Sequence, residues 1–230
     1  MTGDQPNRCV GADFCQEFDG ITNVIFSRIY AGHPRSRTIM TSERFALIAD
    51  LSPLTPGHLL LLPKAHFLSF AQVARHMPDE LRRVFDLVTH LYSQTFGVPV
   101  ILEHGSACND DHNACVTHAH WHLVPVSGPD MVDLMREDGL RPVVVSDLAS
   151  APWPDTPYYL VGHGGILHIC HPATPMPRQY VRSLIGRWLG MQDPEWDYAV
   201  IVRHELLRET MDLTAWWQDR CGQSAGSADF

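Results

Sequence analysis

Three histidines at alternate positions constrain this chain more than any other feature of its sequence. Residues 117–124 read Thr-His-Ala-His-Trp-His-Leu-Val, with imidazoles at His118, His120 and His122. Alternate side chains of a β-strand point to the same face, so a strand here brings the three rings together. At about 3.3 Å rise per residue, neighbouring rings of the triplet lie about 6 to 7 Å apart. This spacing lets them act on one ligand or one ion.

Three interpretations of the triplet stay open on the residues alone. The rings could form a polar face whose hydrogen bonds are satisfied within the fold. They could bind a catalytic metal, because His-x-His on a strand with a distant third ligand is a common zinc arrangement. They could also support covalent catalysis, in which one neutral imidazole is the nucleophile and its neighbours fix its tautomer and charge.

The segments before and around the triplet predict an α+β fold. Apolar runs bounded by turn residues predict strands at residues 45–50, 58–63, 98–103 and 117–126. Apolar residues at three- and four-residue spacing predict a helix over residues 78–96, and Gly97 closes it. Residues 38–127 are therefore expected to form a unit built on an antiparallel sheet.

The rest of the chain divides into two further parts. Residues 1–24 are rich in Gly and Asp and predict an irregular segment that carries Cys9 and Cys15. Residues 128–230 predict a second region of mixed strands and helices. Its expected strands are residues 158–161 and 166–169, and its expected helices are about residues 179–189 and 205–218.

Composition and charge narrow the class of protein. The formal charge is −9 and Lys and Arg form no cluster, which argues against a polynucleotide partner because such binding needs a basic face. No apolar run approaches the roughly 18 residues of a membrane span. The N-terminus has no secretion signal, so a cytoplasmic location is expected. Six scattered cysteines are too few for a disulfide scaffold at this length.

The triplet and its surroundings resemble the histidine triad family. His118-Ala-His-Trp-His122 followed by Pro125 matches the family's central motif. Phe45-Ala-Leu-Ile-Ala-Asp50 and Pro56-Gly-His-Leu-Leu-Leu-Leu-Pro-Lys-Ala-His66 stand at the family's expected positions, and the match covers about residues 24–126. Pro177-Arg-Gln-Tyr-Val-Arg182 and Trp196-Asp-Tyr198 look like a C-terminal extension found in one branch of the family.

The resemblance implies the histidine triad fold, an antiparallel sheet of about five strands with helices packed on it, plus a C-terminal α/β extension at residues 128–230. The core is expected at residues 25–127. Relatives usually pair two cores into one sheet, so a homodimer is expected. No organic cofactor is expected.

By the same resemblance, His120 is the nucleophile that attacks the α-phosphate of a nucleoside phosphate derivative. His122 and His58 would line the phosphate, and one of them would donate to stabilise charge and assist the leaving group. Asp50 would accept hydrogen bonds from the two ribose hydroxyls. The apolar slot for the base would be formed by Phe26, Ile29 and Ile48.

The chain departs from the family pattern before the triad. Many relatives carry Gly-Gln-Ser there to donate to the phosphate, whereas this chain has Asn113-Ala-Cys115, and Cys115 is a weak donor. Glu103 stands where the family usually has Asn. Later in the chain, Gln179 and Arg182 at a helix start could meet an anion.

Several relatives hold a structural zinc, and the matching candidates here are Cys9, Cys15, His66 and His118. Two thiolates and two imidazoles suit a closed tetrahedral site. Five residues separate the cysteines where two are usual. If this site forms, His118 is a metal ligand and does not act in catalysis.

Other activities remain compatible with the sequence. Within enzymes, a nucleotide phosphorylase or nucleotidyltransferase would use phosphate or a sugar phosphate as acceptor in place of water. The missing Gln and Ser donors also leave room for a nucleotide-binding regulator with little catalysis. A metal-dependent hydrolase that uses all three histidines is a third alternative.

Overall fold

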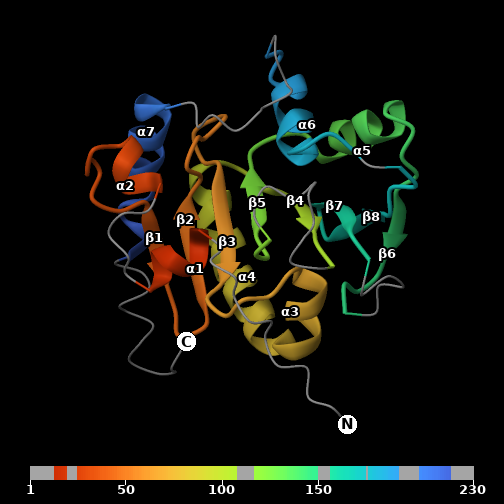
Figure 1. Ribbon diagram of the computed structural model, residues 1–230, viewed down its shortest axis with the longest axis horizontal. Coiled ribbons are helices and arrows are strands. Elements are labelled where there is room, and N and C mark those ends of the chain that lie inside the picture. Colours follow the sequence, from red (N-terminus) through yellow and green to blue (C-terminus); the bar gives the residue numbers. More distant parts are fainter. Residues whose placement is uncertain are drawn as a thin grey trace.

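Eight strands form one antiparallel sheet in the computed structural model, which describes residues 13–19, 25–107, 117–149, 156–174, 176–191 and 202–218 (Figure 1). The strand order is β1-β2-β3-β5-β4-β7-β8-β6. The strands are β1 (Thr38–Thr41), β2 (Phe45–Ala49), β3 (Leu59–Pro63), β4 (Val100–Gly105), β5 (Trp121–Val124), β6 (Val143–Val145), β7 (Tyr158–His163) and β8 (Ile166–Cys170). The helices are α1 (Asp13–Phe18), α2 (Ile25–Ile29), α3 (Phe70–His76), α4 (Pro78–Thr95), α5 (Gly128–Glu137), α6 (Tyr180–Trp188) and α7 (His204–Thr214).

Helices cover both faces of this sheet. On one face α3, α4 and α7 pack against alternate strand residues such as Leu47, Leu61 and Leu123, and α4 runs behind β2 and β3 in Figure 1. On the other face α5 and α6 cover the part of the sheet around β4 and β7. There α1 covers the β2–β3 part through Phe14, which packs on Ile48 and Leu60. The second face carries the imidazoles.

The long helix α4 confirms the predicted apolar periodicity. It begins at Pro78, whose fixed φ suits the first helical position, and acidic Asp79 and Glu80 follow in the first turn. Its buried side chains are Leu81, Val88, Leu91 and Tyr92. Gly97 follows the helix with φ of +91°, which is a left-handed conformation that favours glycine.

The turn between β2 and β3 depends on Gly57. Its φ is +80°, and a Cβ at this position would lie 2.7 Å from the ring of Phe96. The Gly57 carbonyl accepts a hydrogen bond from Tyr92 Oη (2.7 Å), and its N–H donates to Thr210 Oγ1 (3.0 Å). Contacts from α4 and α7 thus hold the turn that presents Asp50 and His58.

The C-terminal region continues the sheet of the core. The five core strands, β1, β2, β3, β5 and β4, confirm the expected antiparallel sheet, and β7 then pairs with β4 along five residues from Ile101↔Gly162 to Gly105↔Tyr158. Helix α7 returns to the core, where Trp217 Nε1 donates to Thr95 Oγ1 at 3.0 Å. The boundary proposed at residues 127 and 128 therefore does not separate two sheets.

This pairing bears on the expected homodimer. The core alone would have β1 and β4 as its edge strands, and the chain's own β7 occupies the edge of β4. Two cores therefore cannot join into one sheet through β4. Pairing through β1 or β6 stays open, and the homodimer remains a prediction.

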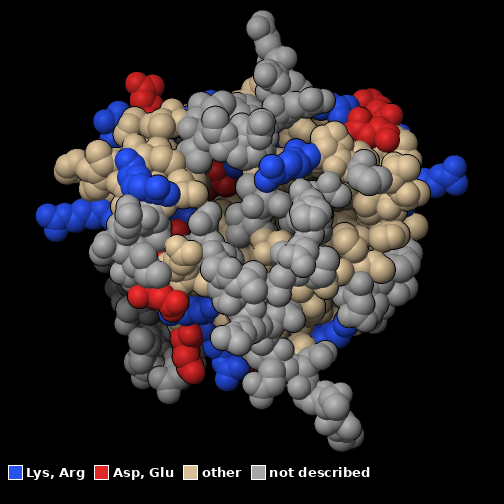
Figure 2. Space-filling view, in the orientation of Figure 1, with Lys and Arg blue, Asp and Glu red and all other residues tan. Residues whose placement is uncertain are grey.

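Two further features concern the outer surface. In the part of the chain that the structure describes, no helix has the length and apolarity needed to cross a membrane. On the face shown in Figure 2, Lys and Arg side chains stand apart from one another and form no continuous basic band.

Candidate functional site

The turn between β2 and β3 places Asp50 and His58 next to the triad strand. Asp50 follows β2, His58 precedes β3, and the Asp50 N–H donates to the His58 carbonyl at 3.0 Å. His122 lies on β5 directly opposite Leu60 of β3 and Leu102 of β4. All three side chains are buried, with exposed fractions of 4% for Asp50, 0% for His58 and 6% for His122.

His120 is oriented by the main chain two residues before it. Its Nδ1 donates to the His118 carbonyl at 2.7 Å, so the neutral ring carries its proton on Nδ1 and a lone pair on Nε2. Among the described residues, Nε2 has no hydrogen-bond partner. Burial lowers the pKa of His120, although its hydrogen bond to His118 and the charge of Asp50 oppose that shift. The ring is therefore a neutral base at pH 7.

His58 and His122 form a directed hydrogen-bond pair. The Leu54 N–H donates to His58 Nδ1 at 3.3 Å, which leaves the proton of a neutral His58 on Nε2. That Nε2 lies 2.9 Å from His122 Nδ1 and donates to it. A neutral His122 then carries its own proton on Nε2. Burial lowers the pKa of His58 to about 4 and that of His122 well below its usual value.

Asp50 is bound by an arginine from the C-terminal region. Arg182 Nη1 donates to Asp50 Oδ1 at 2.8 Å, and Arg182 Nη2 donates to the Ser52 carbonyl. The Ser52 N–H donates to the same Oδ1 at 2.8 Å. Burial alone would raise the pKa of Asp50, but the charge of Arg182 and the adjacent imidazoles hold it well below its usual value. Asp50 is an anion at neutral pH.

A second cluster joins Cys15 of α1 to His66 and His118. The Cys15 Sγ lies 3.4 Å from His66 Nδ1 and 3.3 Å from His118 Nδ1, and the two Nδ1 atoms are 3.3 Å apart. Tetrahedral zinc with ligand bonds of about 2.0 to 2.3 Å needs ligand atoms about 3.3 to 3.6 Å apart. His118 Nε2 donates to the Pro63 carbonyl at 2.8 Å, which leaves the Nδ1 lone pair directed at the cluster. These three residues fit a metal site.

Of the three triad histidines, His118 thus points away from the other two and toward Cys15 and His66. The predicted strand over residues 117–126 is shorter in the structure, where β5 spans Trp121–Val124. Residues before Trp121 leave the pleat, so alternation no longer governs the direction of the His118 side chain. Both of its ring nitrogens have partners outside the His58–His122 pair.

The segment expected to be irregular contains helix α1, so that prediction is wrong for residues 13–18. No apolar period in the sequence signals a helix this short, and tertiary contacts hold it in place. Glu17 forms a two-pronged ion pair with buried Arg37, at 2.6 and 3.0 Å. The Phe14 ring lies 5.6 Å from that of His120 and 5.8 Å from that of His118. Helix α1 therefore covers one side of the His120 ring.

The metal-binding alternative has a second candidate group in Asp50, His58 and His122, whose ligand atoms all lie within 4.8 Å of one another. Here the His58 N–H points at the lone pair of His122, so neither atom is free to bind an ion. The Arg182 guanidinium beside Asp50 adds a positive charge. Both features favour a network of hydrogen bonds among these side chains over a bound cation.

Glu103 corrects one of the expected substrate contacts. It follows Leu102, which is paired with His122, so alternation along β4 turns Glu103 to the opposite face of the sheet. There it is fully buried and accepts hydrogen bonds from the Phe70 N–H (2.7 Å), Trp121 Nε1 (3.0 Å) and Tyr158 Oη (2.8 Å). Glu103 joins α3, β5 and β7 and does not face the imidazoles.

Glu103 should make the stability of the protein depend on pH. Burial raises its pKa to about 7 from an ordinary 4.5, although its three hydrogen bonds lower it in part. The folded state therefore holds the proton more tightly, and this contribution is present below pH 4.5 and is lost as pH rises through about 7. Between pH 5 and 8, the wild type should lose about 3 kcal/mol of unfolding free energy relative to Glu103→Gln.

Denaturant unfolding of both proteins at several pH values measures this difference. Glu205→Gln is the matched control, because Glu205 is exposed on α7, and its difference from the wild type should stay constant with pH. A constant difference for Glu103→Gln as well would contradict the expected titration.

His104 is the site-face residue that the sequence analysis missed. It lies two residues beyond Leu102 on β4, and the antiparallel register with β5 carries that face toward His120. Its ring packs at a tilt against that of Tyr159, with centroids 4.7 Å apart, and the Tyr159 ring in turn lies 4.9 Å from that of Tyr180 of α6. Strand parity relative to His122 was the signal that could have identified it.

Of the residues expected to hold the base, Phe26 and Ile29 lie in one apolar cluster and Ile48 lies in another. Ile48 is fully buried beneath Phe14, whereas Phe26 packs with Tyr30 in the cluster on the other face. Ile29 is half-buried at the edge of the cluster that contains Phe26. Of the remaining expected residues, Gln179 is buried and begins α6 in a left-handed conformation with φ of +60°. Cys9 and Cys115 lie outside the described residues.

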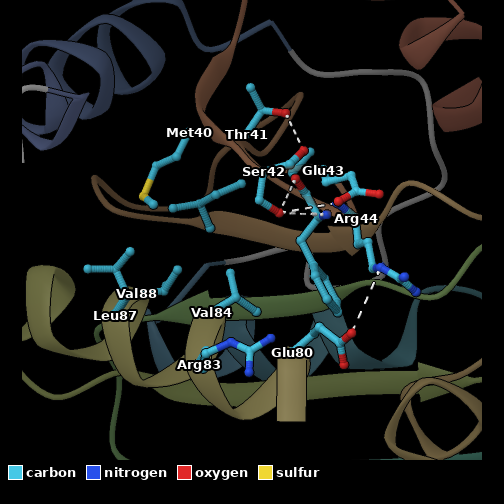
Figure 3. Close-up of a pocket in the computed structure, with 13 residues that line it drawn as sticks. Met40, Thr41, Ser42, Glu43, Arg44, Glu80, Arg83, Val84, Leu87 and Val88 are labelled. Carbon is cyan, nitrogen blue, oxygen red and sulfur yellow. Dashed lines mark hydrogen bonds and ion pairs between the residues drawn. The ribbon is translucent and has the colours of Figure 1, made fainter. Parts of the chain in front are cut away.

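A separate pocket lies between the β1–β2 hairpin and α4 (Figure 3). Its walls are mostly apolar, and Arg44 reaches across its mouth to Glu80 at 3.9 Å. The lining residues include no His, Cys or Asp. None of the imidazoles described above lines it, so this pocket is distinct from the site around them.

Comparisons with known proteins agree with the geometry. The family model for the HIT domain matches residues 32–128. An uncharacterised HIT-like protein of Saccharolobus solfataricus is 24% identical over 116 residues, which cover 49% of this chain and 80% of that protein. The protein HitA of Neisseria gonorrhoeae is 39% identical over 57 residues, which cover 24% of this chain and 53% of that protein.

Among solved structures, a histidine triad protein from Clostridium difficile is 20% identical. The match covers 51% of this chain and 92% of that one, with a TM-score of 0.36. The HIT domain match ends at residue 128, so α6 and its Arg182 lie outside the matched region.

Proposed function

Because residues 32–128 form a HIT domain and the chain belongs to that family, we propose that it is a nucleotide hydrolase or transferase that cleaves at the α-phosphate through a nucleotidyl-histidine intermediate on His120. One observation carries this proposal. The His118 carbonyl fixes the proton of His120 on Nδ1 and leaves the Nε2 lone pair without a partner among the described residues.

The first step forms a bond between Nε2 of His120 and the α-phosphorus and breaks the bond from phosphorus to the leaving group. The Nε2–H of His122, whose Nδ1 accepts the N–H of His58, donates a hydrogen bond to the leaving group, and a leaving group that needs a proton takes it from the solvent. The His120 ring then carries a positive charge, and the hydrogen bond from its Nδ1–H to the His118 carbonyl stabilises it.

In the second step, water or another acceptor attacks phosphorus and the bond to Nε2 breaks. The attacking group loses its proton to the solvent, and departure of the phosphoryl group restores the neutral His120 ring. The acceptor distinguishes the three enzyme classes under consideration: water for a hydrolase, phosphate for a phosphorylase and a sugar phosphate for a nucleotidyltransferase.

A structural zinc bound by Cys15, His66 and His118 is part of the proposal. The distances between their ligand atoms suit a tetrahedral ion, and Cys9 is the proposed fourth ligand from the sequence. This role makes His118 a ligand and excludes it from proton transfer. Its carbonyl still orients His120, so the metal site and the nucleophile share one residue.

Trapping of the intermediate tests this function. The enzyme is incubated with adenosine 5′-phosphoramidate or a diadenosine polyphosphate and quenched in alkali, where a phosphohistidine-type bond persists. We expect a nucleotide-labelled peptide that contains His120, together with catalytic turnover. Saturable binding with neither turnover nor label would support a nucleotide-binding regulator. Turnover without label that a chelator abolishes and added metal restores would support a metal-dependent hydrolase. A homodimer and a cytoplasmic location belong to the proposal as predictions.

A further inference from the structure

The accepting capacity of Asp50 is largely used within the chain. Its Oδ1 receives two donors, the Ser52 N–H and Arg182 Nη1, both at 2.8 Å. A carboxylate oxygen has about two lone-pair positions, so Oδ1 has none left for a ligand. Its Oδ2 lies 3.7 Å from His58 Nε2 and faces the buried imidazole pair. The Asp50 side chain is only 6% exposed.

This geometry bears on recognition of the sugar. A carboxylate that accepts both hydroxyls of a ribose needs one free position on each oxygen. Here the Arg182 guanidinium holds one oxygen, and the ion pair is itself buried, with side-chain exposed fractions of 11% and 6%. A ribose diol could use both oxygens of Asp50 only if it displaced a charged and buried partner, which is strongly unfavourable.

The side chains around Asp50 offer hydrogen-bond donors to a ligand, whereas the oxygens of Asp50 are largely occupied as acceptors. Arg182 uses two of its five N–H groups on Asp50 and Ser52, and among the described residues the other three have no acceptor. One turn earlier, Gln179 is buried with 8% exposed, and its side chain makes no capping hydrogen bond. Its left-handed conformation costs energy for a residue other than glycine, which is a common feature of binding sites.

We propose that Arg182 is a specificity-determining residue that withdraws Asp50 from ribose recognition, so that the enzyme acts on nucleotides without reading the 2′- and 3′-hydroxyls. This inference rests on the proposed function and names its substrate class. Ribonucleotide, 2′-deoxynucleotide and 2′,3′-dideoxynucleotide derivatives are then comparable substrates. Asp50 acts as a positioning residue, whose own negative charge lies beside the His58–His122 pair. Residues beyond the HIT domain therefore complete the site.

The test compares two substrates on the intact wild-type protein. The kcat/KM for adenosine 5′-phosphoramidate is measured against that for its 2′,3′-dideoxy analogue. We expect the two values to agree within about threefold. If Asp50 accepted both hydroxyls, loss of two hydrogen bonds to a charged group would lower kcat/KM for the analogue by about 100-fold. A drop of that size in the wild type would overturn the inference.

Variants then assign the effect to Arg182. In Arg182→Ala the Asp50 carboxylate is released, and the ribose substrate should become preferred over the dideoxy analogue by at least about tenfold. Arg182→Gln serves the same purpose if the alanine variant does not fold. Arg187→Ala is the matched control, because Arg187 lies on the same helix and binds Asp138. Its substrate ratio should equal that of the wild type.

The outcomes separate this inference from the proposed function. If the folded Arg182 variants kept the substrate ratio of the wild type, Arg182 would not govern sugar recognition. If neither substrate were turned over and no label appeared on His120, the proposed function itself would fail. Turnover of both substrates with a strong ribose preference in the wild type would retain the function and reject the inference.

Discussion

Replacement of His120 by alanine should abolish turnover, with kcat lowered by roughly 10⁴-fold or more, as for the loss of other covalent nucleophiles. The reason is that the attacking Nε2 disappears, and neither of the other two imidazoles near it can replace it. His58 Nε2 and His122 Nδ1 are bonded to each other, and His122 Nε2 carries a proton. Single-turnover assays with adenosine 5′-phosphoramidate measure the effect.

The fold should survive this substitution, because the His120 side chain makes one hydrogen bond, to a main-chain carbonyl. Circular dichroism and the melting temperature check that expectation. His90→Ala is the matched control, since His90 is exposed on α4 and bonds only to Gln94. A His120→Ala protein that folds and keeps more than about a tenth of the wild-type rate would rule out the covalent mechanism.

Replacement of Cys15 by serine should remove the bound zinc and destabilise the protein. Serine is a poor ligand for zinc, and the site would keep only two of the ligands that the structure brings together. A ligand present at 1,000 times its dissociation constant stabilises the folded state by about 4 kcal/mol, which is the expected loss under those conditions. The zinc content of the dialysed protein and its unfolding free energy with and without chelator measure both effects.

Cys170→Ala provides the control for this experiment. Cys170 is buried under α5 and α6 with Tyr159 and Val161, in an apolar cluster that does not include Cys15. Its loss should lower stability without lowering the zinc content. Cys9→Ser tests the proposed fourth ligand in the same way. Wild-type protein that neither contains nor takes up zinc would eliminate the site, whereas covalent catalysis at His120 could still stand.

Zinc loss should also slow the chemistry. The His118 side chain lies in the cluster with Cys15, and the His118 carbonyl accepts a hydrogen bond from His120 Nδ1. If loss of zinc displaces His118, this hydrogen bond no longer fixes the tautomer of His120. Helix α1 carries both Cys15 and Phe14, and the Phe14 ring packs against His120. A lower kcat in zinc-free protein therefore would not by itself indicate a catalytic metal.

Strand alternation predicted part of this site correctly. His120 and His122 lie near each other, with ring centroids 5.0 Å apart, and His58 joins them from the neighbouring strand. Local spacing sufficed there because His122 lies on β5 and His120 directly precedes that strand. It was insufficient at His118, where the chain leaves the pleat. The assignment of Glu103 needed the register of β4 against β5, and the sequence does not reveal that register.

The C-terminal region shows the same division on a larger scale. The strands β7 and β8 and the helices α6 and α7 lie at the places expected from the sequence, whereas α5 and β6 were not predicted. Their partners are not apparent, because β7 continues the core sheet beside β4. A strand's own residues specify its faces, whereas its neighbour depends on which edge the folded core leaves open.

The amino-acid sequence alone determined which imidazoles are available for the proposed chemistry, since it sets the type and spacing of the histidines. Only the tertiary structure decided what surrounds that nucleophile. Arg182 reaches Asp50 across 132 positions of the chain, and Cys15 reaches His118 across 103. Neither contact has a local signal, because such pairs form only when packing of the whole core brings distant segments together.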